Sequence, residues 1–306
     1  MKIQYEIWKP NTNTQLTLDY AQKIISDYRA RGYVLTLRQL YYQLVASDLI
    51  GNTQKQYDRL GRIVTKARNA GIIDWEAIED RTRERKELST WNDPASIVRA
   101  AIQSYRIDKW QNQPYRVYVW VEKEALAGVI ERACFDDDYR TDYVCCRGYM
   151  SASTIWREAR NFRTVSGMDD QIPIILHLAD HDPSGIDMTD DNINRIARYS
   201  GLDHWWKHTD PEPGFFVYER IALNMKQIDE YNPPPNYAKS SDSRFDDYYA
   251  KYGDQSWELD ALDPDVLVEL IQKHIHMWRD EVLWQEMDHQ EEEDMLKLEE
   301  LVEDLS

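Results

Sequence analysis

The chain has 306 residues, enough for about two domains of ordinary size. Hydrophobic residues make up 42% and charged residues 30%, so the composition predicts a globular chain with a buried core. No apolar run approaches the roughly 20 residues that a membrane-spanning helix needs, and no apolar segment near the first residues resembles a secretion signal. Three cysteines, two of them adjacent, do not make a disulfide framework, so a reducing, cytoplasmic location is expected.

The net charge of −18 is unevenly distributed along the chain. Residues 1–115 carry 18 Lys and Arg against 13 Asp and Glu, whereas the remaining residues carry 19 against 42. Parts of opposite sign indicate a basic, nucleic-acid-binding module joined to an acidic one. The acidic run from Glu286 to Asp304 is expected to be a solvated helix or tail, with partner binding or DNA mimicry as the alternative.

Residues 1–110 are predicted to form a helical domain. A first helix carries the apolar stripe Leu18, Ala21, Ile25 and Tyr28, and Gly32 suits its C-terminal cap. Thr36 and Gln39 are spaced as a capping box for a second helix, and a third is expected at 54–70. With the irregular stretch 75–85 after them, these helices predict a winged helix-turn-helix.

The recognition helix of such a domain would be the segment 54–70. On it, basic side chains recur at spacings of four, three and four residues and form one stripe: Lys55, Arg59, Arg62 and Lys66. This stripe is predicted to contact DNA phosphates. The alternative is an ordinary solvated outer face.

Residues 111–306 change from helical to alternating periodicity. Strands are predicted at Tyr115–Val121, 143–146, 174–179 and 215–218. Helices are predicted between them, at 125–134, 154–162 and 186–199. Strands that alternate with helices predict an α/β fold with a parallel sheet and a site at the carboxyl ends of its strands. After it, 233–253 is expected to be a loop and 263–284 a helix.

Three carboxylates are predicted to meet at that carboxyl edge. Glu122 directly follows the first strand, and Asp180 and Asp182 directly follow the apolar strand 174–179. Clustered carboxylate oxygens suit Mg²⁺, with Mn²⁺ as the chemically similar alternative. The structural alternative is a turn in which the aspartates only cap the next helix.

The motif Asp-x-Asp-Pro-x-Gly at 180–185, placed after an apolar strand, resembles the Toprim domain of topoisomerases, primases and some nucleases. Residues 178–187 resemble in particular a segment of the topoisomerase VI A subunit and of the related meiotic double-strand-break transesterase. Residues 147–149 resemble their glycine-tyrosine turn, and 37–42 the segment with their DNA-attacking tyrosine. Residues 257–264 look like a late segment of the family, and no role is assigned to them.

The resemblance implies a winged helix (1–110) followed by a Toprim domain (111–306). It implies that Tyr42 is the nucleophile with Arg38 as its partner. Glu122, with a catalytic role as well, and the two aspartates of the motif would hold Mg²⁺. It further implies a homodimer in which the tyrosine of one subunit acts with the metal of the other.

Helix geometry is consistent with this assignment. Residues four apart share a helix face, so Arg38 is expected beside Tyr42, where it would lower the pKa of the phenol or hold a phosphate. Tyr42 lies about 100° around the helix from Tyr41, so Tyr41 is expected to pack inward and Tyr42 to face outward. The alternative is that Tyr42 is a structural tyrosine in a chain that has 20.

Three functions remain open. The leading hypothesis is cleavage of double-stranded DNA by Tyr42 in a stand-alone protein, because no phosphate-binding Gly-x-x-x-x-Gly-Lys-Ser/Thr loop of an ATPase is present. The second is a hydrolytic, defence-type Toprim nuclease that uses metal-activated water. The third is a non-catalytic DNA-binding or DNA-mimicking protein with an unidentified protein partner.

Overall fold

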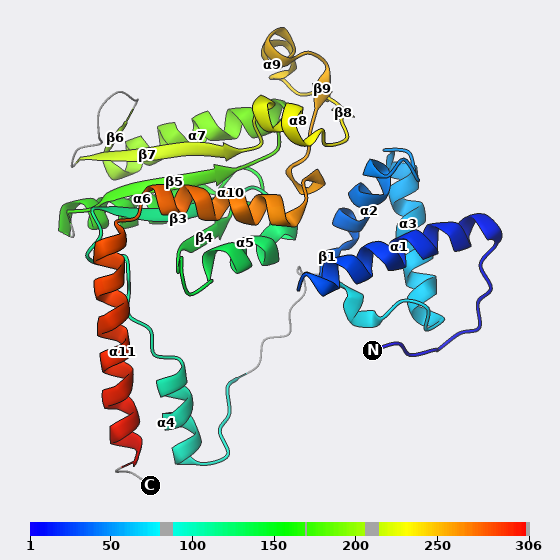
Figure 1. The fold of residues 1–306 in the computed structure, drawn as a ribbon. Helices are drawn as coiled ribbons and strands as arrows, with labels where there is room; N and C mark the ends of the chain where they lie inside the picture. Colours follow the sequence, from blue (N-terminus) through cyan, green and yellow to red (C-terminus); the bar gives the residue numbers. More distant parts are fainter. Residues whose placement is uncertain (80–87, 169, 206–213, 304–306) are drawn as a thin grey trace.

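Among the residues that the structure describes (1–79, 88–168, 170–205 and 214–303), the second half forms a five-stranded parallel sheet. Figure 1 shows this computed structural model, in which the strands lie in the order β4-β3-β5-β7-β6. Their bounds are β3 Tyr115–Val121, β4 Asp142–Cys145, β5 Ile172–Leu178, β6 Asp203–His204 and β7 Phe215–Ala222. The predicted α/β class with a parallel sheet is therefore confirmed.

Helices cover both faces of the sheet (Figure 1). α5 (Ala127–Cys134) and α10 (Pro264–Met277) pack on one face, and α6 (Ala152–Met168) and α7 (Pro183–Ser200) pack on the other. All seven residues of β5 are buried, as expected for a central strand that is covered on both sides. The apolar character of this strand in the sequence reflects that double coverage.

The order of the strands creates a crevice at one edge of the sheet. β3 pairs with β4 on one side and with β5 on the other, so the connections leave β3 in opposite directions. Ligands of open α/β sheets bind at such a switch point, outside the carboxyl ends of the strands. Glu122 follows β3 and Asp180 follows β5 at this point.

Residues 1–79, called the helical module below, form a separate core. Its helices are α1 (Thr12–Ala30), α2 (Leu37–Ala46) and α3 (Gln54–Asn69), joined by the parallel pair β1 (Leu35–Thr36) and β2 (Ile78–Glu79) and by the short turn η1 (Trp75–Ala77). The capping box at the start of α2 is present, and Gly32 after α1 has a left-handed φ of 83°. The three predicted helices are confirmed. The predicted winged helix-turn-helix stays a prediction, because residues 80–85 of its wing lie outside the described residues.

The segment predicted as the loop 233–253 contains two further elements. β8 (Asn236–Tyr237) pairs with β9 (Gln255–Ser256), and α9 (Phe245–Tyr252) lies between them. The helix forms because its aromatic side chains recur three and four residues apart, and Tyr248 is buried against His181. The polar composition hid this spacing, so the loop prediction was wrong.

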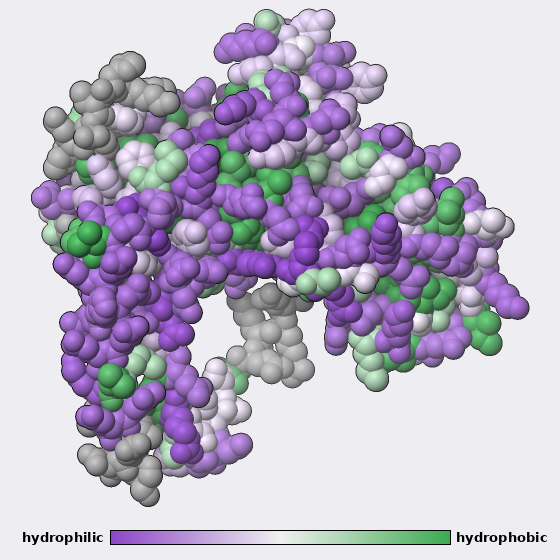
Figure 2. All heavy atoms as spheres, viewed as in Figure 1, coloured by the Kyte–Doolittle hydropathy of each residue, from purple (hydrophilic) through white to green (hydrophobic). Residues whose placement is uncertain are grey.

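The remaining elements lie around the sheet. α8 (Met225–Tyr231) follows β7, and the short turns η2 (Glu124–Leu126) and η3 (Leu259–Ala261) precede α5 and α10. α4 (Pro94–Gln103) lies beside α11 (Glu281–Glu303), and this pair extends away from the sheet (Figure 1). Figure 2 shows the visible face of α11 as mostly hydrophilic, in agreement with a solvated acidic helix. None of the described helices combines the length and the apolar character that crossing a membrane requires.

Candidate active site

The ends of the two central strands are tied together by Glu122. Its backbone N–H donates to the carbonyl of Leu178 over 2.9 Å, which continues the pairing of β3 with β5. One carboxylate oxygen of Glu122 accepts the backbone N–H of Asp180, also over 2.9 Å. The structure therefore brings Glu122 and Asp180 together at the carboxyl edge, where the sequence places them.

Asp182 caps the helix that follows. Its carboxylate accepts the N–H of Gly185 over 2.6 Å, and Pro183 occupies the first turn of α7. Gly185 cannot be replaced easily, because a Cβ there would lie 2.1 Å from the carbonyl oxygen of Asp180. The glycine thus lets α7 begin directly against Asp180, and the helix-capping role is present for Asp182.

Arg220, which sequence analysis missed, supports this turn from below. It projects from β7 and donates to the carbonyls of Gly185 over 2.8 Å and of Ala179 over 3.0 Å, and also to that of Asp180. The guanidinium thereby fixes the backbone that carries both aspartates. An arginine in the middle of a predicted strand gave no signal of this role.

Asp180 has two acidic neighbours that sequence analysis did not assign. Carboxylate oxygens of Asp180, Glu258 and Asp260, called the acidic cluster below, lie within 4.8 Å of one another. Asp260 is 1% exposed, and the backbone N–H of Leu259 donates to Asp180 over 2.8 Å. Among the described residues, this cluster and not the predicted set with Glu122 and Asp182 supplies three ligand atoms at that spacing.

A backbone pairing brings the acidic cluster together. His181 exchanges two 2.9 Å hydrogen bonds with Trp257, so the residue after β5 pairs with the residue before Glu258. The sequence signal was weak but present: Glu258 and Asp260 lie two apart in the segment 257–264 that resembles the family.

Two basic side chains neutralise part of the acidic cluster. The ammonium of Lys123 lies 2.9 Å from Asp180 and 2.8 Å from Asp260, and it also pairs with Glu258. Arg38, from α2, lies 3.0 Å from Asp260 and pairs with Glu258. The predicted site residue Arg38 is therefore at the cluster, and Lys123 is an addition to it.

The acidic groups differ strongly in their affinity for protons. Burial raises the pKa of Asp180 to about 8 despite the nearby Lys123. Burial also raises the pKa of Glu122, with Asp182 adding to it. At Glu258 the effect of burial is outweighed by Lys123 and Arg38, which hold its pKa at about 2. Glu258 is thus an anion at neutral pH, whereas metal-free Asp180 keeps a proton readily.

The donor set fits a divalent cation. With all groups ionised, five carboxylates at this edge face three basic side chains, which leaves two negative charges uncompensated: Glu122, Asp180, Asp182, Glu258 and Asp260 against Lys123, Arg38 and Arg220. Carboxylate oxygens are the ligands that Mg²⁺ and Mn²⁺ prefer. The buried acidic cluster could therefore bind a metal ion, although these residues do not identify which one.

Tyr42 lies against the acidic cluster but is not exposed. It is 4% exposed, as is Tyr41, so the expectation that it faces solvent was wrong. It does leave the apolar stripe of α2, but the second half of the chain covers it. Its hydroxyl hydrogen-bonds Glu258, and the Arg38 guanidinium lies 5.9 Å from the centre of its ring.

The environment of Tyr42 stabilises the neutral phenol. Burial raises its pKa above the ordinary value, and the charges of Glu258 and Asp260 raise it further, which outweighs Arg38 and Lys123. The expected lowering of this pKa by Arg38 is therefore not found. A cavity of about 180 Å³ opens beside the ring, with Asn52 and Tyr57 also in its wall.

The predicted DNA-binding stripe lies on α3. Lys55, Arg62 and Lys66 are exposed, and Arg59 is half-buried. Within the part of the chain that the structure describes, no ion pair engages any of these four side chains. They are therefore free to contact an anionic partner.

The fold and these contacts define an α/β protein with a candidate metal site at the carboxyl edge of a parallel sheet. No protein-family model matches the chain, and no curated protein matches it. The similarity to the topoisomerase VI A subunit thus depends on the motifs described above.

Proposed function

We propose that the chain cleaves double-stranded DNA by transesterification, with Tyr42 as the nucleophile and the acidic cluster as its metal site. The observation that carries this proposal is the hydrogen bond between the Tyr42 hydroxyl and Glu258, inside the network of Arg38, Lys123 and Asp260. A purely structural tyrosine has no need of such a surrounding of charged groups.

In the proposed reaction, one phosphate ester is exchanged for another. The Tyr42 oxygen forms a bond to a backbone phosphorus as the bond to one deoxyribose oxygen breaks. The phenol loses its proton, the released deoxyribose oxygen gains one, and no oxidation or reduction takes place. Arg38, which is already beside the ring, would hold a non-bridging oxygen of that phosphate.

The metal contribution is assigned to Asp180, Glu258 and Asp260, with Glu122 fixing the backbone of Asp180. When bound there, a divalent cation supplies positive charge that stabilises the charge developing on phosphate oxygens. Lys123 would have to give up at least part of its contact with these carboxylates. The exposed bases of α3 would bind the duplex through its phosphates.

A hydrolytic nuclease is the second candidate, and a specific observation favours it. Tyr42 is buried and its pKa is raised, which is the opposite of an activated nucleophile. In that case water would attack the phosphate, and Tyr42 would only pack against Arg38 and Glu258.

Denaturing electrophoresis of labelled duplex DNA separates the two. After reaction with Mg²⁺ or Mn²⁺, transesterification leaves DNA covalently attached to protein, and this adduct should disappear in Tyr42→Phe. Tyr41→Phe is the matched control, because its hydroxyl hydrogen-bonds Asn52 instead of the acidic cluster.

The outcomes are distinct. An adduct that only Tyr42→Phe removes supports the proposal. Cleavage without any adduct, retained in Tyr42→Phe, contradicts it in favour of hydrolysis. Binding of duplex DNA without cleavage under either metal contradicts both and points to a DNA-binding protein.

A further inference from the structure

We infer that each subunit forms its site alone, so that Tyr42 acts with the acidic cluster of its own chain. This inference depends on the proposed function. It departs from the arrangement that the resemblance implies, in which tyrosine and metal come from different subunits.

The first support is direct contact between α2 and the acidic cluster. Arg38 and Tyr42, one turn apart on α2, both engage Glu258, and Arg38 also lies 3.0 Å from Asp260. A partner's helix could reach the same carboxylates only after these contacts were broken. The buried charges of Glu258 and Asp260 would then lose a cation.

The second support comes from contacts away from the cluster. Tyr28, in α1, donates to Asp263 over 3.1 Å, and Arg31 lies 3.0 Å from the same carboxylate. On the other side, Asn52 donates to the carbonyl of Pro235 over 3.1 Å and to the side chain of Asn236 over 2.6 Å. The helical module is thus held at several points around α2.

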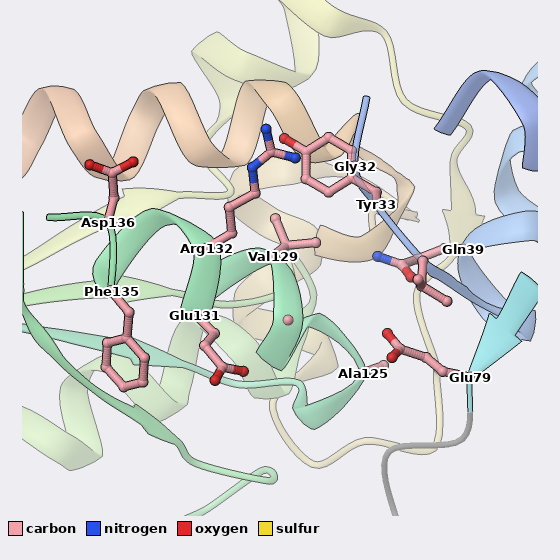
Figure 3. Close-up of a pocket in the computed structure, with 12 residues that line it drawn as sticks. Gly32, Tyr33, Gln39, Glu79, Ala125, Val129, Glu131, Arg132, Phe135 and Asp136 are labelled. Carbon is pink, nitrogen blue, oxygen red and sulfur yellow. The ribbon is translucent and has the colours of Figure 1, made fainter. Parts of the chain in front are cut away.

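The third support is the junction with α5. The guanidinium of Arg132 lies 4.3 Å from the centre of the Tyr33 ring and donates to the carbonyl of Arg31 over 2.6 Å. Figure 3 shows Arg132 reaching from α5 toward Tyr33 across a cavity of about 530 Å³. This contact fixes the segment that leads into α2, and therefore the direction in which Arg38 and Tyr42 point.

Covalent linkage favours the same arrangement. The module and the sheet belong to one chain, so their contacts form at the high effective concentration of an intramolecular reaction, about millimolar for short flexible linkers. A partner subunit at micromolar concentration must compete with it. The intramolecular site is therefore expected to persist even where the protein dimerises through another surface.

Mixing two inactive variants tests the inference. Tyr42→Phe lacks the nucleophile, and Asp260→Asn lacks a cluster carboxylate. If sites form within one chain, every site in the mixture is defective, and adduct formation stays at the level of the separate variants. If sites form between subunits of a dimer, random mixing restores about a quarter of the wild-type yield, which would overturn the inference.

A cross-linking experiment tests the arrangement without relying on activity. In a Cys145→Ser background, which removes the half-buried native cysteine, Asn52→Cys and Asn236→Cys are combined and treated with a short bismaleimide. We expect a cross-link within one chain, which migrates as a monomer on denaturing gels. The control mixes the two single-cysteine proteins, and a dimer-sized product there would contradict the inference.

The two experiments keep the failures apart. If the wild type forms no adduct while the doubly substituted chain cross-links within itself, the proposed function fails and the arrangement stands. If the wild type forms an adduct and the single-cysteine mixture cross-links between chains, the function stands and the inference fails.

Discussion

Asp180 occupies the position where burial and function conflict most. Its carboxylate lies among Glu122, Glu258 and Asp260, and only the ammonium of Lys123 compensates it closely. A buried, incompletely paired carboxylate holds its proton, which is why its pKa is raised to about 8. Such a group costs stability in the metal-free protein, and sites that bind cations accept this cost.

The sign of its pH effect follows from the two pKa values. An aspartate in an unfolded chain titrates near about 3.9, so the folded protein binds this proton more tightly than the unfolded chain does. The stabilisation from the protonated group is complete below about pH 4 and is lost as the pH rises to about 8. Asparagine does not titrate, so Asp180→Asn should escape this loss.

We therefore expect the melting temperature of Asp180→Asn, relative to wild type in EDTA, to rise by at least about 2 °C between pH 5 and pH 8.5. Differential scanning calorimetry measures it. Asp190→Asn, an exposed position on α7, is the control and should differ from wild type equally at both pH values. A difference for Asp180→Asn that stays constant or falls would refute the assigned burial effect.

At the residue scale, the sequence predicts identity better than environment. Glu122, Asp180 and Asp182 were placed correctly by the strands that precede them. The exposure of Tyr42 was not, because helical periodicity describes one module and says nothing of what packs on its outer face.

The helices of the module show how far local patterns reach. Capping and apolar spacing predict α1, α2 and α3 well, because these signals act within a few residues. The same rules fail for α9, where aromatic spacing is masked by Asp and Ser. The basic stripe on α3 is local too, and its exposure makes its proposed role testable.

Replacing Arg59, Arg62 and Lys66 by alanine should weaken binding to all duplex sequences alike. The slope of log affinity against log salt concentration should flatten by about 0.9 for each phosphate that the variant no longer binds. Fluorescence anisotropy over a salt series measures the slope. Lys2, Lys9 and Lys23, also exposed, replaced together give the same change in charge and should leave it unaltered, whereas an unchanged slope in the α3 variant would mean that the stripe is a solvated face.

At the scale of the molecule, the site depends on contacts between distant parts of the chain. Glu258 and Asp260 reach Asp180 only because His181 pairs with Trp257, and Arg38 reaches them only because the module packs on this edge. Neither event leaves a periodic signal in the sequence. The sheet and its carboxyl edge could be predicted, whereas the companions of Asp180 had to come from the fold.

The central claim is that the acidic cluster binds a divalent cation, and titration calorimetry with Mn²⁺ tests it most directly. Wild type should bind one ion, Asp260→Asn should bind it at least about tenfold more weakly, and Asp190→Asn should match wild type. Wild type that binds no Mn²⁺, or Asp260→Asn with unchanged affinity, would contradict the account.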